Sequence, residues 1–420
     1  MRFFQPILFL ILTNLYLLCG SSFAQVEEDS LSNSKLLAPK VYLDCNRCDF
    51  NYIRREITFV NYVRDRKVAE VHLMVTTQRT GSGGTEYTLH FLGQNNYAGM
   101  NDTLIYATNQ TDTREERRAG YTRSMKLGLI RYAAKTPIAN QIDISYKEPA
   151  QQEEVVDKWN YWVFRTNANT FFFGQESTSF LNLNGSVRAT RITDHWKIRS
   201  NFNIRYNEQN FETTDGDTKY ITRNYNFSTL IVKSINNHWS IGGRTFTSTS
   251  TFNNTKFRAG ISPAIEYNFF PYSESTRKEF RINYSLNYNN VRYEEITVFD
   301  KTKETLFNQE LGITLEVNQT WGSAETRLEA LNYLHDFSLN RVELSAELDL
   351  KLFKGFSLRL DGEISSIRDQ ISLPKEEASD EEILLGRVQL PTSFQYFGSI
   401  GISYTFGSIY SNIVNSRFGR

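Results

Sequence analysis

The sequence predicts an all-β transmembrane antiparallel barrel of about twelve strands, preceded by a small α/β domain. Three observations lead to this fold class. The chain starts with an export signal, its second half alternates polar and apolar residues, and it contains 23 Tyr and 30 Phe but only 8 Pro. A membrane barrel needs such alternation because one face of each strand meets lipid and the other meets a polar interior.

The first 24 residues are organised as a secretory signal peptide. Met1-Arg2 is a short basic start, residues 7–18 are almost wholly apolar, and Ser22-Phe23-Ala24 places small residues at a cleavage site. The apolar run is too short to cross a bilayer as a helix. Lipidation at Cys19 is the alternative, but Leu18 is large for the position before a lipidated cysteine.

Charge, hydropathy and cysteine usage exclude two classes of protein. The chain has 47 basic and 47 acidic residues, and removal of Arg2 with the signal leaves 46 basic residues, so nucleic acid is not an expected partner. No later segment reaches 18 consecutive apolar residues, which excludes a helical membrane protein. With Cys19 in the signal, Cys45 and Cys48 form a close pair that suits an oxidising compartment.

A small α/β domain, expected to be periplasmic, is predicted over residues 41–146, between linkers at residues 25–40 and 147–157. Asp49 is expected to cap a helix because its carboxylate accepts the free amide protons of the first turn. Gly81-Ser82-Gly83-Gly84 favours a hairpin turn over a phosphate loop, because no Lys-Ser/Thr follows it. The expected strands are residues 41–43, 69–77 and 87–92, and the expected helices are residues 50–58 and 112 or 113 to 134. Residues 142–146 are expected to be extended.

The barrel is predicted over residues 158–406, where the alternation has period two, as in a strand whose faces meet different surroundings. The segment 280–289 is an example, with Phe280, Ile282, Tyr284, Leu286 and Tyr288 on one face and Arg281, Asn283, Ser285, Asn287 and Asn289 on the other. We expect strands centred near residues 165, 184, 203, 226, 244, 262, 285, 313, 328, 346, 360 and 400.

The connections between these segments give the barrel an orientation. If the first strand runs outward, the long connections, such as residues 371–387, fall on the outer side. The tight turns, such as residues 193–195, 236–238 and 353–355, then fall on the periplasmic side. An even strand count leaves both ends periplasmic, with residues 407–420 as a tail.

Over residues 159–406, this alternating, aromatic-rich pattern resembles the outer-membrane β-barrel proteins of Gram-negative bacteria, especially the Asn-rich barrels of the Bacteroidota. Such barrels often end on a terminal aromatic residue, whereas here Tyr404-Thr405-Phe406 is followed by a tail. The strand, strand, helix order of residues 69–77, 87–93 and 115–134 also resembles the periplasmic N-terminal domain of TolB.

Tryptophans mark the expected membrane interface. Asp194-His195-Trp196 and Asn237-His238-Trp239 repeat one motif at two inner turns. Tryptophan favours the headgroup level, where its ring is buried and its N–H stays hydrated. The predicted interface aromatics are Trp159, Trp196, Trp239 and Trp321.

Cys45-Asn46-Arg47-Cys48 follows a predicted strand and opens a helix. Redox sites have this local layout, because a helix N-terminus lowers the pKa of a thiol. The order of the remaining elements differs from thioredoxin, and no second Cys or His pair has metal-ligand spacing. A disulfide bracing the loop is therefore favoured over redox exchange.

The predicted inward positions of the barrel divide by charge. The early strands carry Arg188, Arg205, Arg244, Arg258 and Arg281. The later strands carry Glu316, Glu329, Glu343, Glu347, Asp349, Asp361 and Glu363, with Arg327, Lys351 and Arg359 among them. Two interpretations stand equally: a transverse field that orients polar or zwitterionic solutes, or an ion-pair network that fills a modest lumen.

The leading hypothesis for function is a non-enzymatic channel or passive transporter in the outer membrane, in contact with membrane lipid and lipopolysaccharide. An alternative is an envelope assembly protein whose domain at residues 41–146 binds a periplasmic partner. A second alternative is a barrel hydrolase, but none of the five His, including His335, lies beside an evident Ser or carboxylate. The sequence assigns no catalytic residue, cofactor or metal, and the acidic loop 371–387 is favoured as solvated rather than cation-binding.

Overall fold

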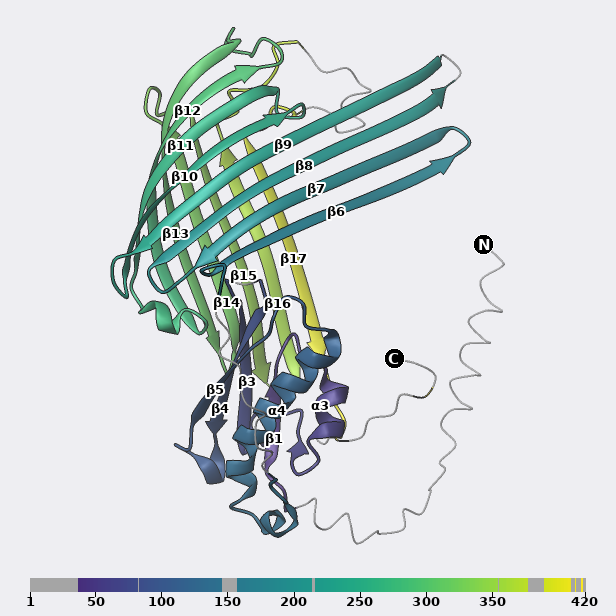
Figure 1. Ribbon diagram of the computed structural model, residues 1–420, viewed down its shortest axis with the longest axis vertical. Helices are drawn as coiled ribbons and strands as arrows, with labels where there is room; N and C mark the ends of the chain where they lie inside the picture. The colour runs from purple at the N-terminus through teal and green to yellow at the C-terminus, as the bar shows by residue number, and fades with distance from the viewer. Residues whose placement is uncertain are drawn as a thin grey trace, which may run out of the picture.

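The computed structural model describes residues 37–81, 83–145, 157–213, 216–353, 355–376 and 389–408, together with Asn412 and Arg417. These residues form a small mixed α/β unit, here called the N-terminal unit (residues 37–145), and a large antiparallel sheet (Figure 1). The predicted signal peptide and the linker at 147–156 lie outside the described residues.

The N-terminal unit contains a five-stranded sheet in the order β2-β1-β3-β4-β5. Strand β1 is parallel to β2 and β3, whereas β3, β4 and β5 are antiparallel. Its described elements are β1 (Lys40–Asp44), α3 (Phe50–Glu56), β2 (Asn61–Tyr62), β3 (Val71–Arg79), β4 (Thr85–Gly93), η1 (Asn95–Tyr97), β5 (Asp102–Ala107), α4 (Arg114–Ala133) and η2 (Pro137–Gln141).

Both helices begin where the sequence predicts. The Asp49 carboxylate accepts a hydrogen bond from the Tyr52 amide at 3.1 Å, which caps α3. Thr113 and Glu116 form a capping box at the start of α4, in which the Glu116 amide donates to Thr113 Oγ1 at 3.2 Å. Each cap satisfies free amide protons of the first turn and stabilises its helix by about 1 kcal/mol.

Helix α4 packs closely on one face of the N-terminal sheet. The core between them contains Leu89, Phe91 and Tyr132, all fully buried. Gly128 permits this approach, because a Cβ at that position would lie 2.1 Å from the Phe91 ring. This one-sided core is what holds the N-terminal unit together.

Two short strands of the unit were not predicted. Strand β2 has two residues, and β5 is a six-residue edge strand, so neither gives a long alternating pattern. Residues 142–145, expected to be extended, follow η2 outside any described strand, and Ile142 has an extended backbone with φ −101° and ψ 116°. Tyr146 lies outside the described residues.

The large sheet contains, within the described part of the chain, twelve strands in sequence order, each antiparallel to the next. They are β6 (Trp162–Gln175), β7 (Thr178–Ile192), β8 (Trp196–Thr213), β9 (Gly216–Ser234), β10 (Trp239–Ser250), β11 (Thr255–Asn268), β12 (Lys278–Tyr293), β13 (Lys303–Gln319), β14 (Gly322–Tyr333), β15 (Asn340–Phe353), β16 (Phe356–Ile367) and β17 (Phe394–Tyr404).

Every predicted strand centre falls within one of these strands, so the twelve-strand antiparallel prediction is confirmed. Closure is not part of what is observed: among the described residues, β6 and β17 are the two edges of the sheet and do not pair with each other. The strands form a curved meander, with the N-terminal unit at one end of it (Figure 1). None of the described helices is long and apolar enough to cross a membrane.

Candidate functional site on the polar face of the large sheet

The register of the large sheet sorts its side chains into two faces. Directly opposed residues on antiparallel strands point to the same side. Arg281 pairs with Thr314, which pairs with Arg327, and the series continues through Ser345 to Glu363. We call the side that carries these residues the polar face and the opposite side the apolar face.

All twelve residues of the predicted charge network lie on the polar face by this register. Four of the basic positions come from β7, β8, β10 and β11, and Arg281 comes from β12. The seven acidic positions come from β13 to β16. The residues are Arg188, Arg205, Arg244, Arg258, Arg281, Glu316, Glu329, Glu343, Glu347, Asp349, Asp361 and Glu363.

The later strands of the polar face hold ion pairs. The Arg281 guanidinium lies 2.9 Å from a Glu279 carboxylate oxygen. On the neighbouring strands, Arg359 lies 2.7 Å from Glu347. Strands β12 to β16 therefore hold ion pairs between neighbouring side chains of the polar face.

The earlier strands are different, because their arginines contact neutral side chains. Arg188 donates to Asn201 Oδ1 at 2.6 Å and Arg205 to Asn184 Oδ1 at 3.3 Å. Among the described residues, no ion pair includes Arg188, Arg205, Arg244 or Arg258. None of these four arginines has a carboxylate at ion-pair distance, so this part of the face keeps separated charges, which is the condition for a field across it.

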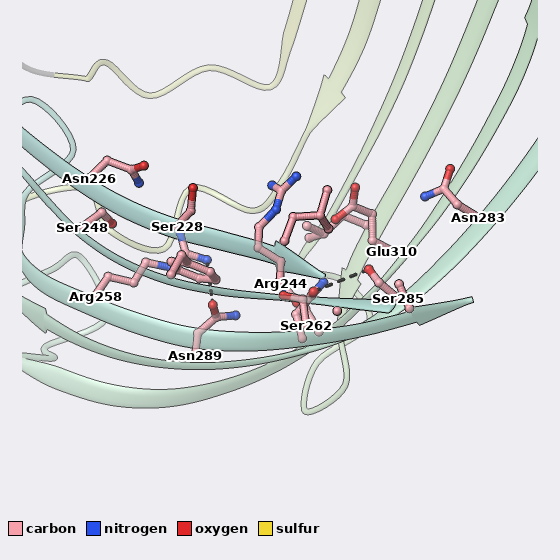
Figure 2. Close-up of a pocket in the computed structure, with 17 residues that line it drawn as sticks. Asn226, Ser228, Arg244, Ser248, Arg258, Ser262, Asn283, Ser285, Asn289 and Glu310 are labelled. Carbon is pink, nitrogen blue, oxygen red and sulfur yellow. Dashed lines mark hydrogen bonds between the residues drawn. The ribbon is translucent and has the colours of Figure 1, made fainter. Parts of the chain in front are cut away.

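A cavity of about 510 Å³ lies on the polar face, lined by side chains of strands β9 to β14 (Figure 2). Since six consecutive strands contribute to one cavity, the sheet curves around this face. Arg244, Arg258 and Glu310 are its charged residues, and asparagines and serines make up most of its remaining wall. This volume is within the range of pockets that hold small molecules.

Two asparagines of this cavity are buried with part of their hydrogen-bonding capacity unused. Asn289 is 1% exposed and Asn308 is 2% exposed. Asn289 accepts from Arg258 Nη2 at 3.3 Å through its oxygen, while its Nδ2 has no partner. Asn308 Oδ1 also has no partner. Buried polar groups are normally hydrogen-bonded, so these atoms indicate a site for something polar.

The apolar face carries mostly large apolar side chains, and these side chains are exposed. Ile261, Leu286, Leu344 and Ile400 come from the middle of four different strands and are each 42% exposed or more. A soluble protein rarely leaves so extended an apolar surface open to water.

Aromatic residues lie at both ends of the apolar face, and the predicted tryptophans fall at the end that we call the inner end and define by the turns after β7, β9, β11, β13 and β15. Trp239 packs against Tyr267 with ring centroids 4.6 Å apart, and Phe269 stacks on Phe280 at 4.5 Å. Trp162, which the sequence analysis missed, stacks on Phe164. The four predicted interface tryptophans, each 39% exposed or more, are at this end: Trp159, Trp196, Trp239 and Trp321.

The N-terminal unit docks on the inner end of the large sheet through the sheet face that α4 does not cover (Figure 1). The Lys351 ammonium, near the end of β15, lies 2.5 Å from Asp44 Oδ1 of β1. Buried His72 lies 3.0 Å from the other oxygen of Asp44. Burial acts to raise the pKa of Asp44, but the His72 hydrogen bond and the Lys351 charge outweigh it and hold that pKa below its usual value.

Further contacts join the two parts of the molecule. Arg66 donates to the carbonyl of Lys351 at 2.7 Å and to that of Thr320. The Asn412 amide oxygen accepts from the Tyr62 backbone at 2.7 Å. The hairpin between β3 and β4 reaches β7, since a Cβ at Gly81 would lie 2.7 Å from that of Ile192. The unit therefore touches both the early and the late strands at the inner end.

His90, on the docking face, is buried as a neutral ring. Burial lowers the pKa of His90 to about 4, and the nearby charge of Arg277, from the turn before β12, adds to this effect. Thr103 Oγ1 lies 3.3 Å from its Nδ1, and its Nε2 is buried without a partner.

The predicted disulfide between Cys45 and Cys48 is present, with Cα atoms 5.6 Å apart. Cys45 is 4% exposed and belongs to the core of the N-terminal unit, with Cys48 packed against that core. The disulfide holds the loop between β1 and α3, and its residues Asn46 and Arg47 line a cavity facing the inner ends of β12 and β13.

The remaining residues that the sequence analysis singled out are the possible metal ligands, His335 and the acidic loop. Among the described residues, no group of three or more His, Cys, Asp or Glu is placed to hold a metal ion. His335 packs against Tyr333 at the outer end, with ring centroids 5.7 Å apart. Of the acidic loop, Glu376 is described and Glu377, Asp380, Glu381 and Glu382 lie outside the described residues.

No protein-family model matches this chain, and no curated protein matches it. The resemblance to outer-membrane barrels therefore stands on the sequence pattern and the twelve-strand sheet alone.

The structure adds residues that the sequence analysis missed. Glu310 and Asn308 lie in the cavity, and the alternation of residues 303–319 was a sufficient signal for their face. The pairing of Asp44 with Lys351 had no sequence signal, because the two residues are distant in the chain.

Proposed function

We propose that the large sheet closes into a barrel in an outer membrane and acts as a narrow channel for small polar solutes, with the N-terminal unit on the periplasmic side. The observation that carries this proposal is the division of the sheet into an exposed apolar face and a charged polar face. Lipid would cover the first and water would fill the space around the second. The export signal and the inner aromatic residues agree with this placement.

Closure requires β6 to pair with β17. The two edge strands run in opposite directions in the meander, as an antiparallel pair needs, and an unpaired edge within a membrane leaves backbone groups unsatisfied at several kcal/mol each. By the register, Thr166 of β6 and Gly398, Ile400 and Ile402 of β17 share the apolar face. Alternate residues on each edge would then match face to face.

Cysteine cross-linking of the refolded mature chain in lipid vesicles tests closure. A cysteine at Thr166 is combined in turn with one at Gly398, Ile400 or Ile402, and one combination should form a disulfide within a single chain. The matched control places the second cysteine at Ser399, which points to the polar face. Cross-links only between chains, or none, would contradict a single-chain barrel, as would mobility on a gel that boiling does not change.

Conductance tests the channel. Insertion of the refolded chain into planar bilayers should give discrete current steps. Removal of the Asp44–Lys351 contact should increase the current, because the N-terminal unit covers the inner end. A barrel that cross-links as expected but carries no current at any voltage would refute the channel while leaving the fold intact.

One observation favours the alternative of an assembly protein that binds a periplasmic partner. Strand β5 is the edge of the N-terminal sheet, and its Ile105 is 63% exposed. An exposed edge can accept an added strand from another protein. Substitution of Ile105 by Lys should then abolish capture of a partner without changing conductance.

A further inference from the structure

We propose that the cavity on the polar face is a binding site for a small zwitterion, with a free α-amino acid as its occupant. This inference rests on the proposed channel function and names the class of solute that the channel would select. In the proposed arrangement, Arg244 binds the carboxylate, Glu310 binds the ammonium group, and Asn289 and Asn308 complete the hydrogen bonds.

Two side chains of opposite charge, Arg244 and Glu310, line the same cavity without forming an ion pair. Arg244 is on β10 and Glu310 on β13, and Figure 2 shows both side chains rising from the sheet in the same direction. Neither belongs to an ion pair among the described residues, although their charges interact across the cavity. A solute with both charges would complete each of them.

Two buried amide side chains, Asn289 and Asn308, line the same cavity. The unpartnered Nδ2 of Asn289 and Oδ1 of Asn308 belong to side chains that line this cavity, but both atoms are buried beneath its surface, so each amide must turn for its unused atom to reach a solute. An ammonium group donates and a carboxylate accepts, so a zwitterion satisfies both unused atoms. A simple anion or cation would satisfy only one.

Stabilisation of the sheet alone does not explain why Arg244 and Glu310 stay apart. Where the later strands need only to neutralise charge, they do so directly, as in the 2.7 Å contact between Arg359 and Glu347. The cavity does not follow this pattern. Arg258 is also committed to Asn289 and lies over the Phe246 ring at 5.4 Å, which leaves Arg244 as the free guanidinium.

Titration calorimetry on the refolded full-length mature chain in detergent micelles tests the site without requiring conductance. L-alanine is the probe, and propionate and propylamine are single-charge controls of similar size. We expect saturable binding of alanine and at least tenfold weaker binding of either control, since each lacks one charge-assisted interaction.

Variants separate this site from the general charge of the face. Arg244→Gln and Glu310→Gln should each weaken alanine binding about tenfold or more. Arg188→Gln and Glu343→Gln change the same charges on the same face outside the cavity and should leave binding within about twofold. Equal loss in all four variants, or unchanged binding in Glu310→Gln, would overturn the site.

The outcomes distinguish failure of this inference from failure of the proposed function. A chain that passes the β6–β17 cross-linking test but binds no alanine retains the barrel and loses the amino-acid site. Tighter binding of dialanine than of alanine would overturn the assignment to a free amino acid. In a conducting barrel, alanine should reduce the current, and Arg244→Gln should remove that effect.

Discussion

The N-terminal unit and the large sheet place their apolar side chains in opposite positions. In the unit, Leu89 and Phe91 are fully buried between β4 and α4, whereas in the large sheet Leu344 and Ile400 are 42% and 76% exposed. Conversely, Arg244 and Glu310 line a cavity on the concave side of the large sheet, whereas the enclosed positions of the unit hold its apolar core. One chain thus contains a region with a buried apolar core and a curved sheet with a polar face and an exposed apolar face.

The proposed function places the two regions in different surroundings. The unit needs only its own helix to cover its sheet, because α4 supplies the second layer. No described element covers the apolar face of the large sheet, and in the proposed barrel lipid would cover it instead. Either region can be destabilised by a substitution that leaves the other region folded.

Phe91→Ala should produce the largest loss, of roughly 3–5 kcal/mol, because it opens a cavity beneath α4 in the core of the unit. Hydrogen exchange of the β3 and β4 amides should rise by orders of magnitude, while exchange in β12 to β15 stays unchanged. Ile105→Ala removes an exposed side chain of the same unit and serves as the control. Simultaneous loss of protection in the large sheet would show that the two regions fold as one.

Leu344→Arg should cost roughly 2–4 kcal/mol in lipid vesicles, because it places a charge on the face proposed to contact lipid. Ser345→Arg, one residue away, points to the polar face and should have little effect. Urea titration of vesicle-refolded protein measures both. Equal effects of the two substitutions would mean that the apolar face does not meet lipid.

These two regions were predictable from the sequence to different degrees. The large sheet was readable because alternation is local: Phe280 to Asn289 shows two faces within ten residues. The faces of Arg244 and Glu343 followed from the same rule. Strand β5 was not predicted, because its six residues are too few to give the long alternating pattern that marks the strands of the large sheet.

The joint between the regions was also beyond sequence reasoning. Asp44 looked like the end of a strand and Lys351 like one charge among many, and only the folded chain brings them within 2.5 Å. The unused atoms of Asn289 and Asn308 are also a property of packing, since asparagine is common in this chain and most copies show no such burial.

Acidification should weaken the docked unit before it affects the large sheet. The pKa of His90 falls to about 4 on folding, so the folded unit binds fewer protons than the unfolded chain between pH 6.5 and pH 4. Its stability is therefore present above pH 6.5 and is lost as the pH falls, by about 2 kcal/mol between pH 7 and pH 5. Asp44 does not contribute in this range, because its pKa lies below the usual value.

Hydrogen exchange of the β4 amides at pH 7 and pH 5, corrected for the intrinsic rate, measures this loss. His90→Gln keeps a neutral hydrogen-bonding side chain and should remove most of the pH dependence. A wild-type unit with the same protection at both values would contradict the assignment of a neutral buried ring.

The smallest expected effect, about 1–2 kcal/mol, is on the joint itself. Lys351→Met keeps the length of the side chain but leaves Asp44, whose side chain is 15% exposed, with His72 as its remaining ionic partner. The N-terminal unit should then sample positions away from the inner end while both regions stay folded. Arg66 still holds two carbonyls there, so release should be partial.

Spin labels at Leu127 on α4 and Leu315 on β13, both exposed, report the position of the unit. Their distance distribution should broaden in Lys351→Met. Arg341→Met is the matched control, since it removes a cation of the same strand that pairs with Asp369 at 3.0 Å near the outer end. If the control broadens the distribution equally, the contact with Asp44 is not what holds the two regions together, and docking rests on Arg66 and on the apolar contact of the β3–β4 hairpin with Ile192.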